Sequence, residues 1–275
     1  MTASTATVET VFLHAAGLCA PGLAGWQMAA PVLRGERGYV DTAPPAFASD
    51  LLPRNERRRL SAATRLALQA AEDVFRQSSV DSEQVRTVFA SCCGDGATID
   101  RICRDLMQPQ RPVSPTQFHN SVHNSAAGYW AIATHCQCAS ISLSAHDGSF
   151  CAGLVEAYAA ARIADGPVLL IAYEHPLPSP LAQALPVCAP FAVALLLNAG
   201  TALDSLGALS LTPIDRTATQ TSCDPALEPL RAGNPAARAL PLLQLLARGV
   251  AGRVVLPYLP QSMLAVDVTQ AGSGA

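Results

Sequence analysis

A strand-to-helix corner near the middle of the chain is where the sequence could hold a catalytic side chain. The segment SLSAHDGSFCAGLVEAYAAARI (142–163) passes from a strand of small residues through a glycine turn into a helix. At such a corner the helix dipole lowers the pKa of a thiol and stabilises an oxyanion. The corner residue is Asp147, a poor nucleophile toward a thioester but a good acceptor for free helix N–H groups. We therefore expect Asp147 to cap the helix and not to attack a substrate.

Three cysteines lie in this helix or at the end of another predicted strand. Each could be a reactive thiol or a packed side chain. Cys151 falls one turn inside the helix, where a cysteine is usually a small buried hydrophobe. Cys92 and Cys93 end an apolar strand beside a glycine loop, and no basic neighbour is predicted for either. Packing is the favoured role for all three. An acyl-thioester hydrolase or acyltransferase that uses Cys93, Cys151 or Ser149 stays open as the alternative.

The histidines and the remaining cysteines do not complete a metal site. His119 and His123 are four residues apart and could share one face of a helix, but the glutamate of the HExxH zinc motif is missing. His135 adjoins a Cys136–Cys138 pair, and the second ligand cluster that zinc would need is absent from the sequence. We expect no metal and no cofactor.

The composition argues against several classes of function. The 275-residue chain has a net charge of −3 and only 14% charged residues, which indicates neither a nucleic-acid surface nor a disordered polar tract. All 18 basic residues are arginine, so no mechanism that needs a lysine is available. No apolar run reaches the roughly 18 residues of a membrane span. Nine cysteines behind an N-terminus without a basic leader predict reduced thiols and a cytoplasmic protein.

Apolar strands alternate with helical patterns over the first 198 residues. Because strands that are apolar throughout belong to a sheet covered on both faces, this alternation predicts an α/β architecture. The predicted strands are 8–18, 85–93, 139–145, 166–174 and 191–198. The predicted helices are 51–77, 98–107 and 148–164, with a loop that passes into a further helix over 114–136.

The pattern changes after Asn198. A strand is predicted at 207–216, then a helix at 234–249 that opens on Asn234 with a proline at its first position, and a closing strand pair at 252–268. We expect residues 1–198 and 199–268 to complete one globule, followed by a flexible tail at 269–275.

Three consecutive arginines lie near the start of the predicted helix 51–77. Arg57, Arg58 and Arg59 stand where the helix dipole does not favour cations. A solvated surface and a contact with an acidic partner are both open interpretations of this run.

Several segments, taken in order, resemble the β-ketoacyl synthases of the thiolase-like superfamily. They are LLPRNERRRLSAATRLALQAAEDVF, FASCCGDGATIDRI, SPTQFHNSVHNSAAGYWAIAT and ISLSAHDGSFCAGLVEAYAAARIADGPVLLIAYE. Together they span roughly Val8 to Asn198. The resemblance implies a thiolase-like layered α/β/α fold with a complete N-terminal half and a reduced second half.

The resemblance also implies that the catalytic residues are missing. It places Asp147 at the position of the catalytic cysteine, and the family takes two histidines and a lysine from its second half. No histidine follows His175 in this chain, and there is no lysine at all. The pattern is similar to chain-length factors, which are synthase-like subunits without the cysteine, and most to the short type of aryl polyene biosynthesis.

A chain-length factor pairs with an active β-ketoacyl synthase, so the resemblance implies a heterodimer in which acyl carrier protein binds mainly through the partner. This chain would then have no catalytic residue of its own and would shape the acyl tunnel. A subunit that only stabilises its partner remains the other version. The tunnel and interface candidates are Phe118, His119, Asn120, His123, Asn124, Tyr129, Trp130, His146, Asp147 and Phe150.

Overall fold

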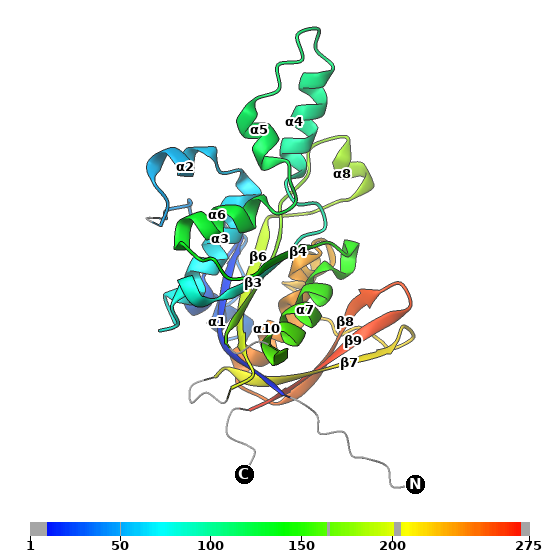
Figure 1. Ribbon diagram of the computed structural model, residues 1–275. Helices are drawn as coiled ribbons and strands as arrows, with labels where there is room; N and C mark the ends of the chain where they lie inside the picture. The colour runs from blue at the N-terminus through cyan, green and yellow to red at the C-terminus, as the bar shows by residue number, and fades with distance from the viewer. Residues whose placement is uncertain (1–9, 50, 164–165, 201–204, 271–275) are drawn as a thin grey trace, which may run out of the picture.

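The computed structural model describes residues 10–49, 51–163, 166–200 and 205–270. Within these residues, nine strands form one mixed sheet in the order β4-β3-β5-β6-β1-β7-β9-β8, with β2 paired to β1 (Figure 1). β3 runs parallel to β4 and β5, and every other pairing is antiparallel. The strands are β1 (Val11–Ala20), β2 (Leu23–Ala24), β3 (Arg86–Ala90), β4 (Ser140–Leu143), β5 (Val168–Glu174), β6 (Phe191–Asn198), β7 (Gly207–Asp215), β8 (Gly252–Leu259) and β9 (Ser262–Thr269).

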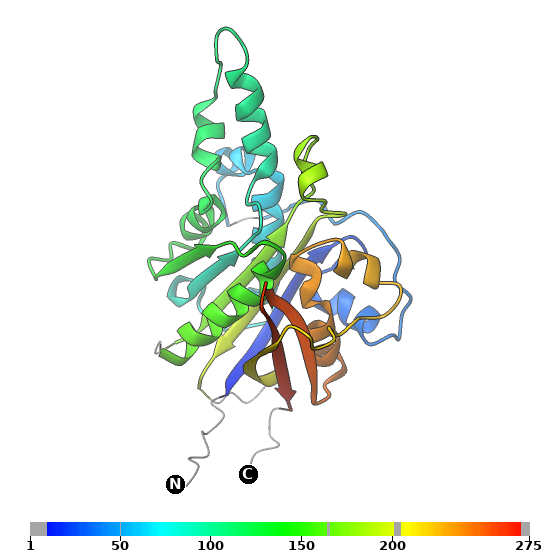
Figure 2. The same cartoon turned by 90° about the vertical axis from the view of Figure 1, so that its right-hand side faces the viewer.

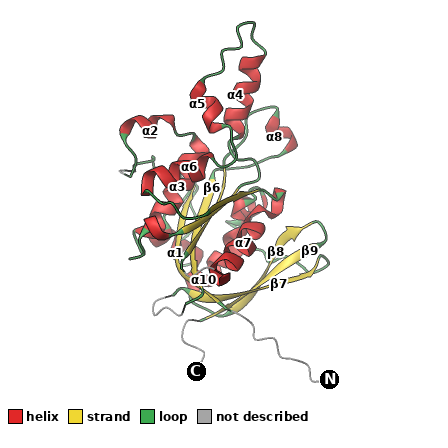
Figure 3. Ribbon diagram, in the orientation of Figure 1, coloured by secondary structure: helices red, strands yellow, loops and turns green. Residues whose placement is uncertain are grey.

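Helices cover both faces of the sheet (Figure 3). They are α1 (Trp26–Leu33), α2 (Arg54–Arg59), α3 (Ala62–Phe75), α4 (Gly96–Leu106), α5 (Pro115–Asn120), α6 (Ser125–Thr134), α7 (Ser149–Ile163), α8 (Leu181–Ala184), α9 (Glu228–Ala232) and α10 (Leu240–Arg248). One core cluster joins α3 and α6 to the sheet, and a second joins α1, α7 and α10 to its other face. In the described part of the chain, no helix is both long enough and apolar enough to cross a membrane.

The central strand β5 shows why the sheet needs both helical layers. Its residues are all buried, and alternate side chains enter opposite clusters: Leu170 packs with the α7 side, while Leu169 and Ile171 pack with the α3 side. This follows from the two-residue period of a strand. The layered α/β/α arrangement predicted from the apolar strands is confirmed.

The C-terminal segment continues the same sheet. β7 pairs with β1, β9 with β7 and β8 with β9, so three antiparallel strands extend the edge beside β1 (Figure 1). The predicted strand at 207–216 and the strand pair at 252–268 are both present. Thr269 still belongs to β9, and the rest of the predicted tail lies, beyond Gln270, outside the described residues.

Two predicted helices are divided in the structure. The helix expected at 51–77 is two helices, because Leu60 is extended (φ −64°, ψ 131°) and Ser61 starts α3 by accepting the Thr64 N–H at 3.1 Å. The helix expected at 234–249 begins as predicted, with Asn234 Oδ1 accepting two main-chain N–H groups, but its first turn is a 3₁₀ turn. α10 then starts at Leu240, and Pro241 occupies its first turn, where no N–H is needed.

α4 and α5 project from the body of the molecule with the loop that joins them (Figures 1 and 2). We call residues 96–122 the arm. Of the α4 residues only Gly96 is fully buried, so the apolar side of this helix is only partly covered by its own chain. The large apolar side chains exposed along the arm are Ile99, Leu106, Met107, Phe118 and Val122.

The close seating of α7 on the sheet gives a test of the packing. A Cβ atom added at Gly153 would lie 2.7 Å from the Ala90 Cβ and 2.8 Å from the Leu170 Cδ1. Gly153→Ala should therefore lower the free energy of unfolding by about 1–3 kcal/mol, as overpacked cores do.

Gly128→Ala is the matched control, because a Cβ atom at this α6 position meets nothing within 4 Å. In the control variant the free energy of unfolding should rise by up to about 1 kcal/mol, because alanine has a higher helix propensity than glycine. Urea unfolding of both variants measures the difference, and equal effects would contradict the packing described here.

Candidate functional site

The strand-to-helix corner is built as a tight elbow between β4 and α7. A 3₁₀ turn at His146–Gly148 joins them, and His146 has a positive φ of 51°. Ser149 closes the turn: its Oγ accepts the Ala145 N–H at 3.0 Å and donates to the His146 carbonyl at 2.7 Å. Only glycine fits at 148, because a Cβ atom there would lie 1.8 Å from the Tyr258 carbonyl oxygen of β8.

Asp147 at this elbow is held by an arginine from the C-terminal segment. The Arg238 Nε and Nη2 atoms both donate to Asp147 Oδ1, at 3.1 and 3.0 Å, and Nη2 also reaches Oδ2 at 3.1 Å. The prediction that Asp147 caps α7 is therefore wrong. A two-point guanidinium contact is stronger than hydrogen bonds from neutral main-chain N–H groups.

The ion pair is asymmetric in its exposure to solvent. The Arg238 side chain is 13% exposed and the Asp147 side chain 43%. A mostly buried guanidinium needs a nearby anion, since leaving such a charge without its partner costs several kcal/mol. Asp147 thus compensates a cation that the C-terminal segment brings to the elbow.

A second ion pair lies in the same C-terminal segment. Arg231, which is buried, donates from Nε and Nη2 to the Glu228 carboxylate. Hydrogen bonds from Arg231 hold the pKa of Glu228 at about 2. The same pair raises the pKa of Arg231, and the negative charge of Asp147 adds to this effect. The segment that follows β7 therefore presents two fixed guanidinium groups on the side of the elbow.

Glu174, at the end of β5, is a buried acid that the sequence analysis did not single out. One carboxyl oxygen accepts the Cys92 N–H, and the other, Oε2, has no hydrogen-bond partner among the described residues. Burial raises its pKa to about 8. Glu174 is an acidic residue at the end of an otherwise apolar strand. This unusual pattern could have identified it from the sequence.

The neighbouring loop holds the two adjacent cysteines. A hydrogen bond between the two thiols raises the pKa of Cys92 and lowers that of Cys93, and both side chains are half-buried. Ser144 donates to the Cys92 carbonyl at 3.0 Å, which ties this loop to the elbow. Cys151 is fully buried with a raised pKa, so it has the packing role predicted for it.

The two histidines four residues apart do not share a helix. His119 lies in α5, where its ring meets the Tyr129 ring edge-on at 5.7 Å. His123 lies in the turn between α5 and α6, with its Nε2 3.2 Å from the Ser91 carbonyl oxygen. Over the described ranges, no group of three histidine, cysteine or acidic side chains is arranged to hold a metal ion.

The tunnel and interface candidates fall into separate parts of the fold. His146, Asp147 and Phe150 lie together at the elbow, whereas Tyr129 and Trp130 are buried on the opposite face of the sheet.

Phe118, in the arm, is 70% exposed. Asn120 is buried and links α5 to α2 and α6, donating to the Arg59 carbonyl and accepting from the Tyr129 hydroxyl. Asn124, exposed, immediately precedes α6. Arg238 was missed, because a contact over 91 residues leaves no local signal.

Glu174→Gln should flatten the pH dependence of stability. The unfolded carboxyl ionises above about its ordinary pKa of 4.5, while the folded one stays protonated up to about 8. Between these values the folded state binds more protons, so wild-type stability falls as pH rises, by at most about 1.4 kcal/mol per pH unit. Above about pH 8, where the carboxyl is ionised in both states, stability no longer changes with pH through this group.

Urea unfolding between pH 5 and pH 9 measures both slopes. Glu83→Gln, at an exposed site, is the control and should keep the wild-type slope. A Glu174→Gln variant whose stability falls with pH as steeply as the wild type would contradict the raised pKa.

Comparison with known proteins agrees with this geometry. The family model for the N-terminal domain of beta-ketoacyl synthases matches residues 32–248. A chain in the complex of the ketosynthase ApeO with its chain length factor ApeC from Xenorhabdus doucetiae is 26% identical, with a TM-score of 0.72. That match covers 94% of this chain and 99% of the other. No curated protein matches the chain.

Two further solved structures share the fold at lower identity. A chain of the ishigamide ketosynthase/chain length factor is 14% identical, with a TM-score of 0.72, over 96% of this chain and 100% of that one. A chain of AntDE:AntF, a type II acyl-carrier protein in complex with its ketosynthase, is 11% identical, with a TM-score of 0.69, over 96% and 99%. The predicted resemblance to ketosynthase-like chain-length factors is confirmed, and the chain belongs to the beta-ketoacyl synthase family.

Proposed function

We propose that this chain is a catalytically inactive chain-length factor that pairs with an active β-ketoacyl synthase in the cytoplasm. The observation that carries the proposal is the Asp147–Arg238 ion pair at the elbow. A carboxylate held by a guanidinium at two points is neither a thiol nucleophile nor a free general base. The partner subunit supplies the cysteine, the histidines and the lysine of condensation.

The sheet edge offers one surface for this partner. β4 is the last strand of the sheet on its side and is only four residues long, and its residues are exposed or half-buried. An edge strand carries main-chain N–H and C=O groups that another chain can pair with. β4 also leads directly into the elbow, so a partner at this edge would lie next to Asp147.

The arm offers a second surface, which is apolar. Met107 is 84% exposed just after α4, and Phe118 is 70% exposed on α5. The other exposed large apolar residues of the arm are Ile99 and Leu106 on α4 and Val122 in the turn after α5. Large exposed apolar patches are typical of interaction sites. The loop at Ser91–Gly94 leads into α4 of the arm, and its Cys92 carbonyl accepts a hydrogen bond from Ser144 beside the elbow, so one partner could cover both.

Within such a pair, the arm would close part of the acyl tunnel, and Phe118 and His146 are the candidates best placed to do so. The similarity to the ApeO–ApeC complex supports a partner ketosynthase and a place in aryl polyene biosynthesis. Acyl carrier protein would bind mainly through the partner. A length-setting subunit and a purely stabilising one differ in one observable: product length responds to tunnel substitutions only in the first.

One observation favours a second candidate function. Cys93 is half-buried with a lowered pKa, which is the setting of a reactive thiol and fits an acyl-thioester hydrolase or acyltransferase. Alkylation of Cys93 together with loss of a thioesterase activity would support this function. Cys151 and Ser149 are less suited to be its nucleophile, because the Cys151 thiol is fully buried and the Ser149 hydroxyl is bonded within the elbow.

Asp147→Cys should not create a condensing enzyme. The variant would place a thiol at the elbow, but Arg238 is its charged neighbour and the chain contains no lysine. Combined with a ketosynthase whose own catalytic cysteine is replaced by alanine, it should form no β-ketoacyl product from malonyl-loaded carrier protein. Mass spectrometry of an iodoacetamide-treated sample confirms that the new thiol is present and accessible. Product formation would contradict the proposed inactivity.

Met107→Asp should weaken the complex with the ketosynthase. Seating a carboxylate against an apolar surface costs desolvation free energy, and a tenfold higher Kd corresponds to about 1.4 kcal/mol. We expect at least that change by isothermal titration calorimetry. Met28→Asp is the matched control, since Met28 is 56% exposed on α1, on the side of the molecule where α10 packs. Equal Kd values for both variants and the wild type would exclude the arm from the interface.

A further inference from the structure

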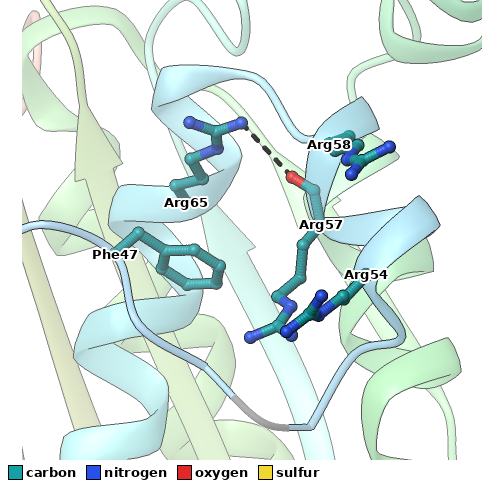
Figure 4. Close-up of a pocket in the computed structure, with 5 residues that line it drawn as sticks. All are labelled: Phe47, Arg54, Arg57, Arg58 and Arg65. Carbon is teal, nitrogen blue, oxygen red and sulfur yellow. Dashed lines mark hydrogen bonds between the residues drawn. The ribbon is translucent and has the colours of Figure 1, made fainter.

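The arginine run near the start of the predicted helix 51–77 is engaged within the chain. Arg65 Nη2 donates to the Arg57 carbonyl at 3.2 Å (Figure 4), and Arg57 Nη1 donates to the Ser49 carbonyl. Arg58 points away from the other arginines drawn in Figure 4. These guanidinium groups do not converge on one space, and the side chains best placed to react lie elsewhere.

Two adjacent thiols lie just after β3, in the loop that leads into α4. Cys92 and Cys93 are both half-buried, and the loop is outside helix and strand, with Gly94 at a positive φ of 57°. A hydrogen bond joins the two thiols. Because the thiols touch each other and are both partly open to solvent, a small molecule can react with them as a pair.

The hydrogen bond makes the two thiols chemically unequal. It raises the pKa of Cys92, the donor, and lowers the pKa of Cys93, the acceptor. The thiolate is the form that attacks a disulfide, so Cys93 reacts first. Once Cys93 is bonded to another sulfur, the hydrogen bond that contributes most to the raised pKa of Cys92 is lost. Cys92 then lies beside the sulfur that it can attack.

We propose that Cys92 and Cys93 form a redox modification site, which a small-molecule disulfide of the glutathione type closes to an intramolecular disulfide. The Cys93 thiolate attacks one sulfur of glutathione disulfide, and one glutathione leaves. Cys92 then attacks the Cys93 sulfur of the mixed disulfide, and the second glutathione leaves. Two protein thiols are oxidised, one glutathione disulfide is reduced, and the two thiol protons end on the two glutathione molecules.

A disulfide at this position is strained and therefore easily reversed. Consecutive Cα atoms are about 3.8 Å apart, below the roughly 4.4–6.8 Å that is usual for a disulfide, and strain makes the bond more reducible. The ring that closes contains the peptide unit between the two cysteines. The carbonyl of this unit accepts the Ser144 hydroxyl at 3.0 Å, so oxidation acts on the contact between the loop and the elbow.

Peptide mass spectrometry of the full-length chain after incubation with glutathione disulfide tests the proposal. Remaining thiols are alkylated with N-ethylmaleimide in urea, and trypsin then releases residues 87–101, in which Cys92 and Cys93 are the only cysteines. We expect this peptide to carry no alkyl group and to be two hydrogen masses lighter than its reduced form. A peptide with two alkyl groups, or one that still carries glutathione, would overturn the proposal.

Single variants test the order of the two steps. Cys92→Ser should retain glutathione on Cys93, because no second thiol displaces it. Cys93→Ser should react at least tenfold more slowly, since burial still raises the pKa of Cys92. Equal rates in these two variants would overturn the assignment of Cys93 as the attacking thiol.

Cys103→Ser is the matched control, because Cys103 is exposed on α4 and lies outside the loop. It should form the disulfide as the wild type does, and loss of the disulfide in this variant would also contradict the proposal. Circular dichroism verifies that the three variants are folded. The assay uses this chain alone, so its outcome does not depend on pairing with a ketosynthase.

Discussion

The contact between Asp147 and Arg238 is the interaction on which the arrangement of this molecule depends. It joins the elbow, at the end of β4, to a 3₁₀ turn that lies 91 residues later in the chain. The guanidinium is mostly buried, so removing its anionic partner would cost several kcal/mol. The carbonyl of Tyr258 packs against Gly148 at the same elbow. The C-terminal segment is thus held to the elbow by an ion pair and by close packing.

This fastening explains how an elbow can persist without a nucleophile. The tight turn depends on glycine at 148 and on the Ser149 hydroxyl. Neither of these contacts requires a particular side chain at residue 147. We infer that the elbow keeps its shape because it supports α7 and borders the surface that meets the ketosynthase. Under the proposed function, the acidic residue serves the internal structure of this subunit, and condensation takes place in the partner.

The sequence predicts the layers of the fold better than the contacts of the site. Strands such as β5, apolar at every position, require two covering layers, and the fold has both. Ser61 is a good helix start inside a helical pattern, and this local signal is what divides the helix predicted at 51–77. The partner of Asp147 depends instead on how a distant segment packs, which no local pattern encodes. The arm shows the same limit, because the amphipathic pattern of α4 suggests burial that its own chain does not provide.

The central claim is that this chain acts only together with a catalytic partner. Its most direct test is to co-express the chain with ketosynthases from the same organism, to measure the mass of the purified complex by native mass spectrometry, and to assay condensation. We expect a one-to-one complex whose activity disappears when the catalytic cysteine of the ketosynthase is replaced. A homodimer that binds none of the ketosynthases would contradict this claim, and so would condensation activity that persists after that cysteine is replaced.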